Sequence, residues 1–251
     1  MPTFLTFALV APMASFGGLA VGERRSGWDR PAKSAVLGLI GACLGVERED
    51  DAGQAALADG YCVALFCHTP GRLLADYHTA QMPSAKRGRR FATRAEELAV
   101  PKWELNTVLS RRDYRIGAWH LGAVWPSAAA PKWSLEELAA AMTRPIFVPS
   151  LGRKSCPLGL PLAPRVAEAA DAQTALLVRH ADGPEAALTV RGGLTLRDAH
   201  ADLPQPPVIT MDASLASGQV RRIEYRRDQP LSRRRWQFGL REEAVLGAGT
   251  Q

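Results

Sequence analysis

Arg30-Pro-Ala-Lys-Ser-Ala-Val-Leu-Gly-Leu-Ile-Gly-Ala-Cys-Leu-Gly-Val46 is the segment from which the architecture can be worked out. Its apolar residues recur at helical spacing, which predicts a helix over about residues 32–44. Gly38, Gly41 and Gly45 repeat along this helix, although each costs about 1 kcal/mol relative to alanine in a helix interior. We therefore expect the glycines to permit very close backbone packing, with the helix laid flat on a sheet.

The start of this helix is a candidate anion site. Pro31 suits the first turn because its missing N–H costs nothing there. Lys33 and Ser34 then bring a positive charge and a hydroxyl to a helix N-terminus, whose free N–H groups already attract phosphate. A buried helix with a fortuitous basic start explains the same residues equally well. The apolar run is well short of the roughly 20 residues needed to span a bilayer.

Alternating and β-branched residues on either side of the helix predict further elements. Five strands are expected, at residues 4–10, 61–67, 73–78, 115–125 and 144–148. The turn at Thr69-Pro-Gly71 is expected to pair the second of these strands with the third. The capping box Ser134-Leu-Glu-Glu137 predicts a short second helix that ends near Met142.

The order of these elements predicts an α+β protein with a ferredoxin-like (RRM-like) βαββαβ domain. We place this domain at residues 1–155 and expect a basic, aperiodic insertion at about residues 79–112. Residues 156–251 are expected to form a smaller, mostly-β C-terminal region. The chain has 251 residues, 47% of them hydrophobic, which is enough for one large domain or two small ones with a real core.

The formal net charge of +6 is concentrated in three arginine-rich clusters. The clusters are Lys86 to Arg94, Arg111 with Arg112, and Arg221 to Arg235. Arginine suits bidentate phosphate contacts, and interleaved aromatic residues are typical of proteins that bind single-stranded nucleic acid. A solvated loop would explain any one cluster, but three clusters in one chain favour a nucleic-acid partner.

The cysteines and the first residues of the chain bear on its compartment. Cys43, Cys62, Cys67 and Cys156 form no CxxC pair, so reduced cysteines in a cytoplasmic protein are expected. Residues 1–10 lack a charged leader, and no small-residue cleavage site follows, so no signal peptide is expected. Either core filling or protein interfaces would suit five of the six tryptophans, Trp103, Trp119, Trp125, Trp133 and Trp236. The core is the expectation for Trp119.

Several segments of the chain carry a resemblance to a known family. They are Ala11-Pro-Met-Ala-Ser-Phe-Gly17, residues 33–46, Asp76-Tyr-His-Thr79, Arg112-Asp-Tyr114, Pro149-Ser-Leu-Gly-Arg-Lys-Ser-Cys-Pro-Leu158, Arg227-Asp-Gln-Pro230 and Arg235-Trp236. In these residues the chain resembles the Cas-five family of the RAMP superfamily, in the branch that belongs to type I-E CRISPR Cascade complexes. The helix and the Leu-Gly-Arg-Lys-Ser-Cys-Pro-Leu motif are its most specific parts, whereas residues 101–107 and 163–202 contribute little.

The resemblance implies a non-catalytic subunit that binds and caps the 5′ handle of the CRISPR RNA (crRNA). Such a subunit would anchor the backbone subunit and the large subunit of Cascade, and it would meet target DNA through the assembled complex. The family fold is a ferredoxin-like domain with a protruding β-hairpin thumb, which would fall at residues 79–112. No cofactor, metal ion or membrane contact is implied.

The same resemblance, together with the charge pattern, suggests the RNA-binding residues. Four are expected to hold handle phosphates: Lys33, Ser34, Arg153 and Lys154. Four arginines are expected to line the RNA path beside a tyrosine that could stack on a base: Arg24, Arg25, Arg111, Arg112 and Tyr114. The thumb arginines are expected to wedge beside the guide: Arg87, Arg89 and Arg90. The remaining expected contacts are His78 and the loop residues Gly152 and Ser155.

Two alternatives stay open at this point. Some Cas-five proteins of a different CRISPR type cut precursor RNA without metal, which needs a general base, a general acid and a cation. Tyr77 and His78 with Lys86, or else His120, could supply them, whereas His68, His180 and His200 are expected to be ordinary surface residues. A purely structural scaffold without RNA contact is the other alternative, and it would leave the arginine clusters unexplained.

Overall fold

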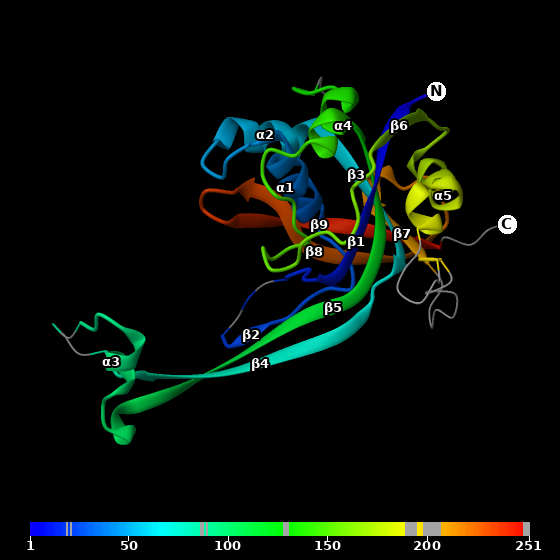
Figure 1. The fold of residues 1–251 in the computed structure, drawn as a ribbon. Helices are drawn as coiled ribbons and strands as arrows, with labels where there is room; N and C mark the ends of the chain where they lie inside the picture. Colours follow the sequence, from blue (N-terminus) through cyan, green and yellow to red (C-terminus); the bar gives the residue numbers. More distant parts are fainter. Residues whose placement is uncertain are drawn as a thin grey trace.

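A computed structural model describes residues 1–18, 20, 22–85, 88, 90–127, 131–188, 195–197 and 207–247. The protein is an α+β structure built on one large sheet, with helices on both faces (Figure 1). The described strands are β1 (Thr3–Ala14), β2 (Arg24–Arg25), β3 (Tyr61–Thr69), β4 (Arg72–Pro83), β5 (Leu105–Pro126), β6 (Arg165–Glu168), β7 (Val208–Asp212), β8 (Val220–Ser232) and β9 (Gln237–Gly247). The described α-helices are α1 (Lys33–Leu44), α2 (Asp51–Gly60), α3 (Arg94–Leu98), α4 (Leu135–Thr143) and α5 (Ala172–Asp182).

The sheet has the strand order β6-β1-β5-β3-β7-β9-β8 along its main path. These neighbours pair antiparallel, whereas the short strand β2 pairs parallel with β5. Strands β6 and β7 lie beyond residue 155 in the chain, yet they pair with β1 and β3. The sheet is therefore continuous across the expected boundary, and the division at residue 155 stays a prediction.

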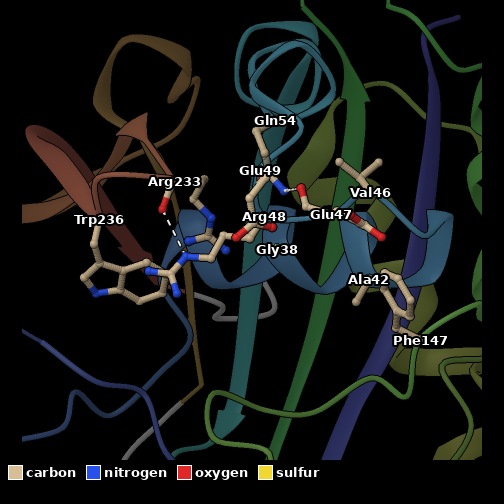
Figure 2. A pocket seen from close by; sticks show the side chains of 10 residues that line it. All are labelled: Gly38, Ala42, Val46, Glu47, Arg48, Glu49, Gln54, Phe147, Arg233 and Trp236. Carbon is tan, nitrogen blue, oxygen red and sulfur yellow. Dashed lines mark hydrogen bonds between the residues drawn. The ribbon is translucent and has the colours of Figure 1, made fainter.

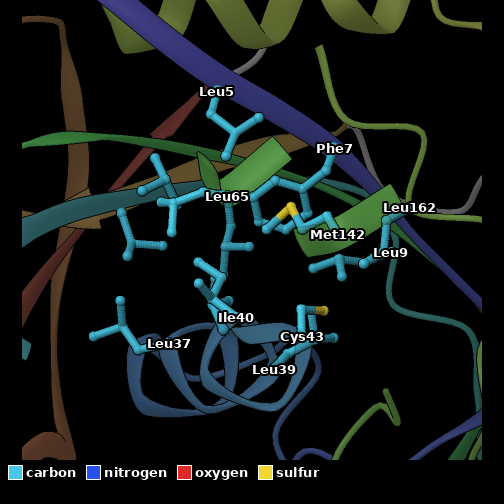
Figure 3. Close-up of a cluster of buried hydrophobic side chains, with 14 of the residues drawn as sticks. Leu5, Phe7, Leu9, Leu37, Leu39, Ile40, Cys43, Leu65, Met142 and Leu162 are labelled. Atoms are coloured by element: carbon cyan, nitrogen blue, oxygen red, sulfur yellow. The ribbon is translucent and has the colours of Figure 1, made fainter. Parts of the chain in front are cut away.

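Strand β1 is buried on both faces, which explains its nearly continuous apolar sequence. Leu5, Phe7 and Leu9 face the core under α1 and α4, and Figure 3 shows them in this cluster. Phe4 and Val10 face the opposite core, which includes residues of α5. Burying both faces fixes the register of the strand, because a slip of one residue would exchange the two sets of side chains.

Helix α1 begins and ends within a residue of the prediction, but its glycines do not face the sheet. The side chains that reach the core are Leu37, Leu39, Ile40 and Cys43 (Figure 3). A Cβ added at Gly38 would meet Arg233, one at Gly41 would meet Leu57, and one at Gly45 would meet Ile146. The expectation that the glycines allow close contact with the sheet was therefore wrong: they make room for side chains from other segments.

A two-stranded arm made of β4 and the first half of β5 projects from the body, with α3 at its far end (Figure 1). The expected pairing of β3 with β4 was wrong, because both strands pair with β5. Thr69 lies opposite Trp119 and Arg72 lies opposite Ile116, so the two strands follow one another along one edge of β5. Pro70 and Gly71 thus interrupt one long strand instead of reversing the chain.

The expected strand at residues 144–148 was also wrong. The segment is irregular. The N–H of Ile146 donates to the carbonyl of Cys43, and the N–H of Phe147 donates to the carbonyl of Ala42, each at 3.0 Å. The bond to Cys43 satisfies a carbonyl group at the end of α1 that has no helical partner, and the bond to Ala42 adds to the one that its carbonyl accepts from the N–H of Gly45. The edge of β1 is taken instead by β6. Helix α4, by contrast, follows its predicted capping box, because both reciprocal bonds between Ser134 and Glu137 are present.

Candidate nucleic-acid interface

The base of the arm brings two distant arginine pairs together. The short strand β2 lies beside β5, with Arg24 opposite Arg111 and Arg25 opposite Arg112. The N–H of Arg111 also donates to the carbonyl of Glu23 at 3.0 Å. All four arginines are exposed. More than eighty residues of chain separate the pairs, so this cluster exists only in the folded protein.

Asp113 holds two of these arginines in place. Its side chain is buried, and its carboxylate lies 3.3 Å from Nε of Arg111 and 3.9 Å from Nη2 of Arg24. Within the described residues, neither Arg25 nor Arg112 has a carboxylate within 4.0 Å. The cluster therefore has two guanidinium groups held by a carboxylate beside two whose charge is available to an incoming anion, although Nη1 of Arg25 also donates to the carbonyl of Gly22. Such a grouping suits the phosphates of a nucleic-acid backbone.

The loop at residues 151–155 is a rigid neighbour of this cluster. Gly152 has a φ of 92°, and a Cβ at that position would run into the carbonyl oxygen of Ser15. The N–H of Ser15 donates to the carbonyl of Leu151 at 3.0 Å, which ties the loop to the end of β1. The hydroxyl of Ser15 in turn donates to the carbonyl of Asp113 at 3.4 Å. A single serine therefore joins the loop to the arm base, with Lys154 and Ser155 exposed on the loop.

Tyr114 lies in this region but differs from its expected role. Its ring is buried, and the guanidinium carbon of Arg153 lies 4.6 Å from the ring centroid. This cation–π contact covers a ring face that the sequence had suggested for a nucleic-acid base. Tyr114 thus positions Arg153, while the exposed aromatic residue nearby is Tyr77, which lies opposite Arg111 across the arm. The pairing of β4 with β5 makes Tyr77 a candidate for stacking on a base. The sequence alone does not show that Tyr77 lies opposite Arg111.

Comparison with known proteins places the chain in a family. The family model described as "CRISPR-associated protein (Cas_Cas5)" matches residues 4–242. The chain belongs to the Cas5 family. It is similar to the curated "CRISPR system Cascade subunit CasD" of Escherichia coli (strain K12), with 31% identity over 185 residues that cover 70% of this chain and 77% of that protein.

Two solved structures share the Cas5 fold seen here. The first is a "CRISPR RNA-guided surveillance complex" chain, with a TM-score of 0.62 and 22% identity over 97% of this chain and 89% of that chain. The second is described as "Crystal structure of Cas protein", with a TM-score of 0.54 and 21% identity over 98% of this chain and 95% of that one. At these identities the comparison supports the fold of this Cas5 chain.

Two expected phosphate ligands of this Cas5 protein, Lys33 and Ser34, lie away from the arm base and are buried. The ammonium group of Lys33 lies 2.8 Å from a carboxylate oxygen of Asp212, and its backbone N–H donates to Asp228 at 2.9 Å. The Asp228 carboxylate thus occupies the N-terminus of α1, where a phosphate was expected. The structure gives Lys33 an internal role, and a contact of Lys33 or Ser34 with RNA stays a prediction.

This carboxylate belongs to a buried ionic network that joins the β8–β9 hairpin to the start of α1. Arg241 donates to Asp228 at 2.8 Å and to Glu243 at 2.8 Å, and Nε of Arg30 donates to Glu243 at 3.0 Å. Burial raises the pKa of Asp228, but Arg241 outweighs it and the pKa is lowered overall. Arg226, part of the expected C-terminal basic cluster, is also buried in this network. Its charge is neutralised inside the protein.

The remaining expected RNA contacts lie on the arm. His78 is exposed on β4 opposite Ser110, and its Nε2 lies 2.9 Å from a carboxylate oxygen of Asp76. Arg90 is exposed between β4 and α3. Arg87 and Arg89 lie outside the described residues. The structure therefore groups Arg24, Arg25, Arg111, Arg112, His78 and the 151–155 loop, and it separates them from Lys33 and Ser34.

Of the residues considered for RNA cleavage, Tyr77 and His78 are exposed neighbours on β4, whereas His120 lies inside the protein. His120 is fully buried, and burial lowers its pKa to about 3, so it cannot take a proton from RNA at the surface. His68 and His180, expected at the surface, instead lie between β3 and α5 with ring nitrogens 2.9 Å apart, and His68 is buried. Lys86 and His200 lie outside the described residues.

Among the described residues, no group of three or more His, Cys, Asp and Glu side chains is arranged to hold a metal ion. No helix there is long and apolar enough to cross a membrane.

Proposed function

We propose that this Cas5 chain is a non-catalytic subunit of a type I-E CRISPR surveillance complex that binds and caps the 5′ handle of the crRNA. The observation that carries the proposal is the meeting of Arg24, Arg25, Arg111 and Arg112 beside the 151–155 loop. Exposed guanidinium groups next to a rigid glycine loop suit a phosphodiester backbone that turns sharply. The name of the Escherichia coli relative, a Cascade subunit, agrees with this role.

The architecture supports a finer description of the fold. Strands β6, β1, β5 and β3 lie in an antiparallel order, with α1 following β1 and α4 following β5. This is the order of a ferredoxin-like βαββαβ unit, and we interpret the β4–β5 arm as its thumb. In a cytoplasmic complex the thumb would lie beside the guide, and the body would anchor the backbone and large subunits, which contact target DNA.

Binding to a labelled CRISPR-repeat RNA tests the proposal. The purified chain should retain the RNA intact on a denaturing gel without added metal, and its affinity should fall when the 5′ handle is removed. Equal affinity for RNA with and without the handle would contradict handle capping. Site-specific cutting would instead favour a metal-independent endoribonuclease and direct attention to Tyr77 and His78.

A double substitution tests the loop within this proposal. Replacing Arg153 and Lys154 with alanine should weaken handle binding and flatten the log–log salt dependence by about 1.4, because each phosphate contact to a single strand contributes about 0.7. A variant with Arg165 and Arg222 replaced by alanine, both exposed and remote from the loop, controls for the lost charge. An unchanged salt slope in the loop variant would remove the loop from the site.

A further inference from the structure

A surface pocket of about 330 Å³ lies on the side of α1 that faces away from the sheet (Figure 2). Its walls come from α1, the turn after it, the segment that follows α4, and the turn between β8 and β9. The lining residues used below are Gly38, Arg48, Phe147, Arg233 and Trp236. None of them belongs to the arm base or to the 151–155 loop.

One wall of the pocket is cationic. The guanidinium carbons of Arg48 and Arg233 lie 4.6 Å and 5.2 Å from the ring centroid of Trp236, whose residue is 60% exposed. Nε of Arg48 donates to the carbonyl of Arg233 at 3.2 Å, which holds the two residues together (Figure 2). Although Glu47 and Glu49 also line the pocket, no carboxylate oxygen of a described residue lies within 4.0 Å of either guanidinium group. The two positive charges therefore lack a counter-ion in the described structure.

Helix α1 is shaped to accept one of these arginines. A Cβ on residue 38 would overlap Nη2 of Arg233, so Gly38 leaves the space that this guanidinium group fills. A helical glycine costs about 1 kcal/mol relative to alanine, and the sheet does not require one here because Gly38 faces away from it. The space at Gly38 thus serves the position of Arg233, not the packing of the core.

Phe147 lines the pocket opposite this wall (Figure 2), and it is the middle residue of an exposed apolar ridge. Ile146, Phe147 and Val148 are 68%, 44% and 86% exposed. The two backbone bonds from Ile146 and Phe147 to the end of α1 hold this ridge in place, and Ile146 packs against Gly45. A fixed ridge of three large apolar side chains loses little conformational entropy when a partner covers it.

We infer that this pocket and ridge form a docking site for a segment of another protein subunit that carries an Asp or Glu carboxylate next to an apolar side chain. The carboxylate would supply the missing counter-ion for Arg48 and Arg233, and the apolar side chain would cover Val148 and Phe147. Tryptophan, phenylalanine and arginine are among the residue types enriched at protein interfaces. Nucleic acid would match the arginines but would leave the aliphatic ridge uncovered. The inference rests on the proposed function only in assuming a multisubunit assembly.

The test uses the full chain co-expressed with the other subunits and the CRISPR RNA of its own locus. Native mass spectrometry of the purified assembly then reports which protein subunits are retained. The variant R48E/R233E should bind one of those subunits at least about tenfold more weakly, as expected when central charged residues of an interface are reversed. K132E/R165E carries the same change in net charge on exposed residues outside the pocket and should assemble normally.

Three further variants separate docking from misfolding. V148D and V148K change the most exposed ridge residue, and both lose the apolar contact. If the partner segment is acidic, V148D should weaken docking more than V148K, because only aspartate repels a carboxylate. G38A should leave the melting temperature unchanged or higher, because alanine favours the helix, yet it should weaken docking because it displaces Arg233.

The outcomes distinguish this inference from the proposed function. Affinity of each isolated variant for repeat RNA is measured in parallel. Full retention of every subunit by R48E/R233E would overturn the docking site, as would equal effects of V148D and V148K. A loss of RNA affinity in R48E/R233E beyond that of K132E/R165E would reassign the pocket to nucleic acid. Failure of the unsubstituted chain to bind handle RNA would contradict the proposed function. The retention of protein subunits by each variant would still test the docking site in that case.

Discussion

Gly152 shows how one residue can set the geometry of the candidate interface. Its φ of 92° is a conformation that side chains rarely adopt, and the carbonyl of Ser15 fills the space where a Cβ would lie. The residue that follows, Arg153, stacks on Tyr114 beside the arm base. The position of the charge therefore depends on a glycine that carries no charge itself.

Gly152→Ala should reduce the free energy of unfolding by about 1–3 kcal/mol, the usual cost of a strained backbone position. It should also weaken binding to handle RNA, because the loop must move away from Ser15 and carry Arg153 with it. Urea unfolding and RNA titration measure the two effects. Gly17→Ala is the matched control, since a Cβ there meets no atom within 4 Å. Equal behaviour of the two variants would mean that the loop adapts without cost.

Buried histidines should make the protein sensitive to mild acid. Burial lowers the pKa of His120 to about 3 and that of His180 to about 4, whereas an unfolded histidine titrates near pH 6.5. The unfolded chain therefore binds more protons between about pH 6.5 and 4, so stability should fall as the pH drops through this window. Unfolding midpoints at pH 7.5, 6.0 and 5.0 measure the effect, and His180→Gln should reduce the slope. A flat profile would contradict buried neutral rings.

At the scale of elements, the arm base depends on strand pairing. The parallel contact between β2 and β5 places Arg24 and Arg25 beside Arg111 and Arg112, and buried Asp113 orients one arginine of each pair. Within each pair, one arginine is therefore held by Asp113, and the charge of the other is available to an anion. Strand geometry, more than the total charge, thus makes the cluster a candidate site.

R25A/R112A should weaken handle binding and flatten the salt dependence by about 1.4 if both residues contact phosphates of a single strand. Its melting temperature should stay close to that of the unsubstituted chain, because both side chains are exposed and neither neutralises the buried Asp113 carboxylate. Titrations at several salt concentrations measure the slope. R165A/R222A removes the same charge elsewhere, and an equal loss of affinity in that control would indicate non-specific attraction.

At the scale of the whole molecule, the body and the arm are built differently. The body buries both faces of its sheet, whereas the arm is a two-stranded ribbon that extends into solvent (Figure 1). The residues of β4 are exposed over nearly its whole length. We therefore expect the arm to contribute recognition and little stability.

Replacing residues 84–104 with an Asn-Gly turn should leave the body folded, because Pro83 and Leu105 already lie opposite each other and such a turn suits a hairpin. Thermal unfolding should remain cooperative, with a melting temperature within a few degrees of that of the full chain. Circular dichroism checks this, and assembly with guide RNA reports what the arm tip contributes. Loss of cooperative unfolding would show that the tip supports the body.

Local sequence patterns were enough to predict helix α1, the capping box of α4, the central strands β1, β3 and β5, and membership of the Cas5 family. These features rest on local periodicity and short motifs, which act over a few residues. The sequence also placed Trp119 in the core correctly. The basic insertion, identified from its lack of apolar periodicity, includes the far part of the arm.

Only the tertiary structure decided which charges are exposed and which side chains meet. Lys33 and Arg226 look like RNA contacts in the sequence, yet the carboxylates of Asp212 on β7 and Glu243 on β9 neutralise them inside the protein. The partner of β4, the role of Tyr114 and the space at Gly38 depend on residues far away in the chain. Contacts between segments far apart in the chain determine which side chains are buried and which charges have a counter-ion. The residue pattern of one segment contains no information about the side chains that another segment places beside it.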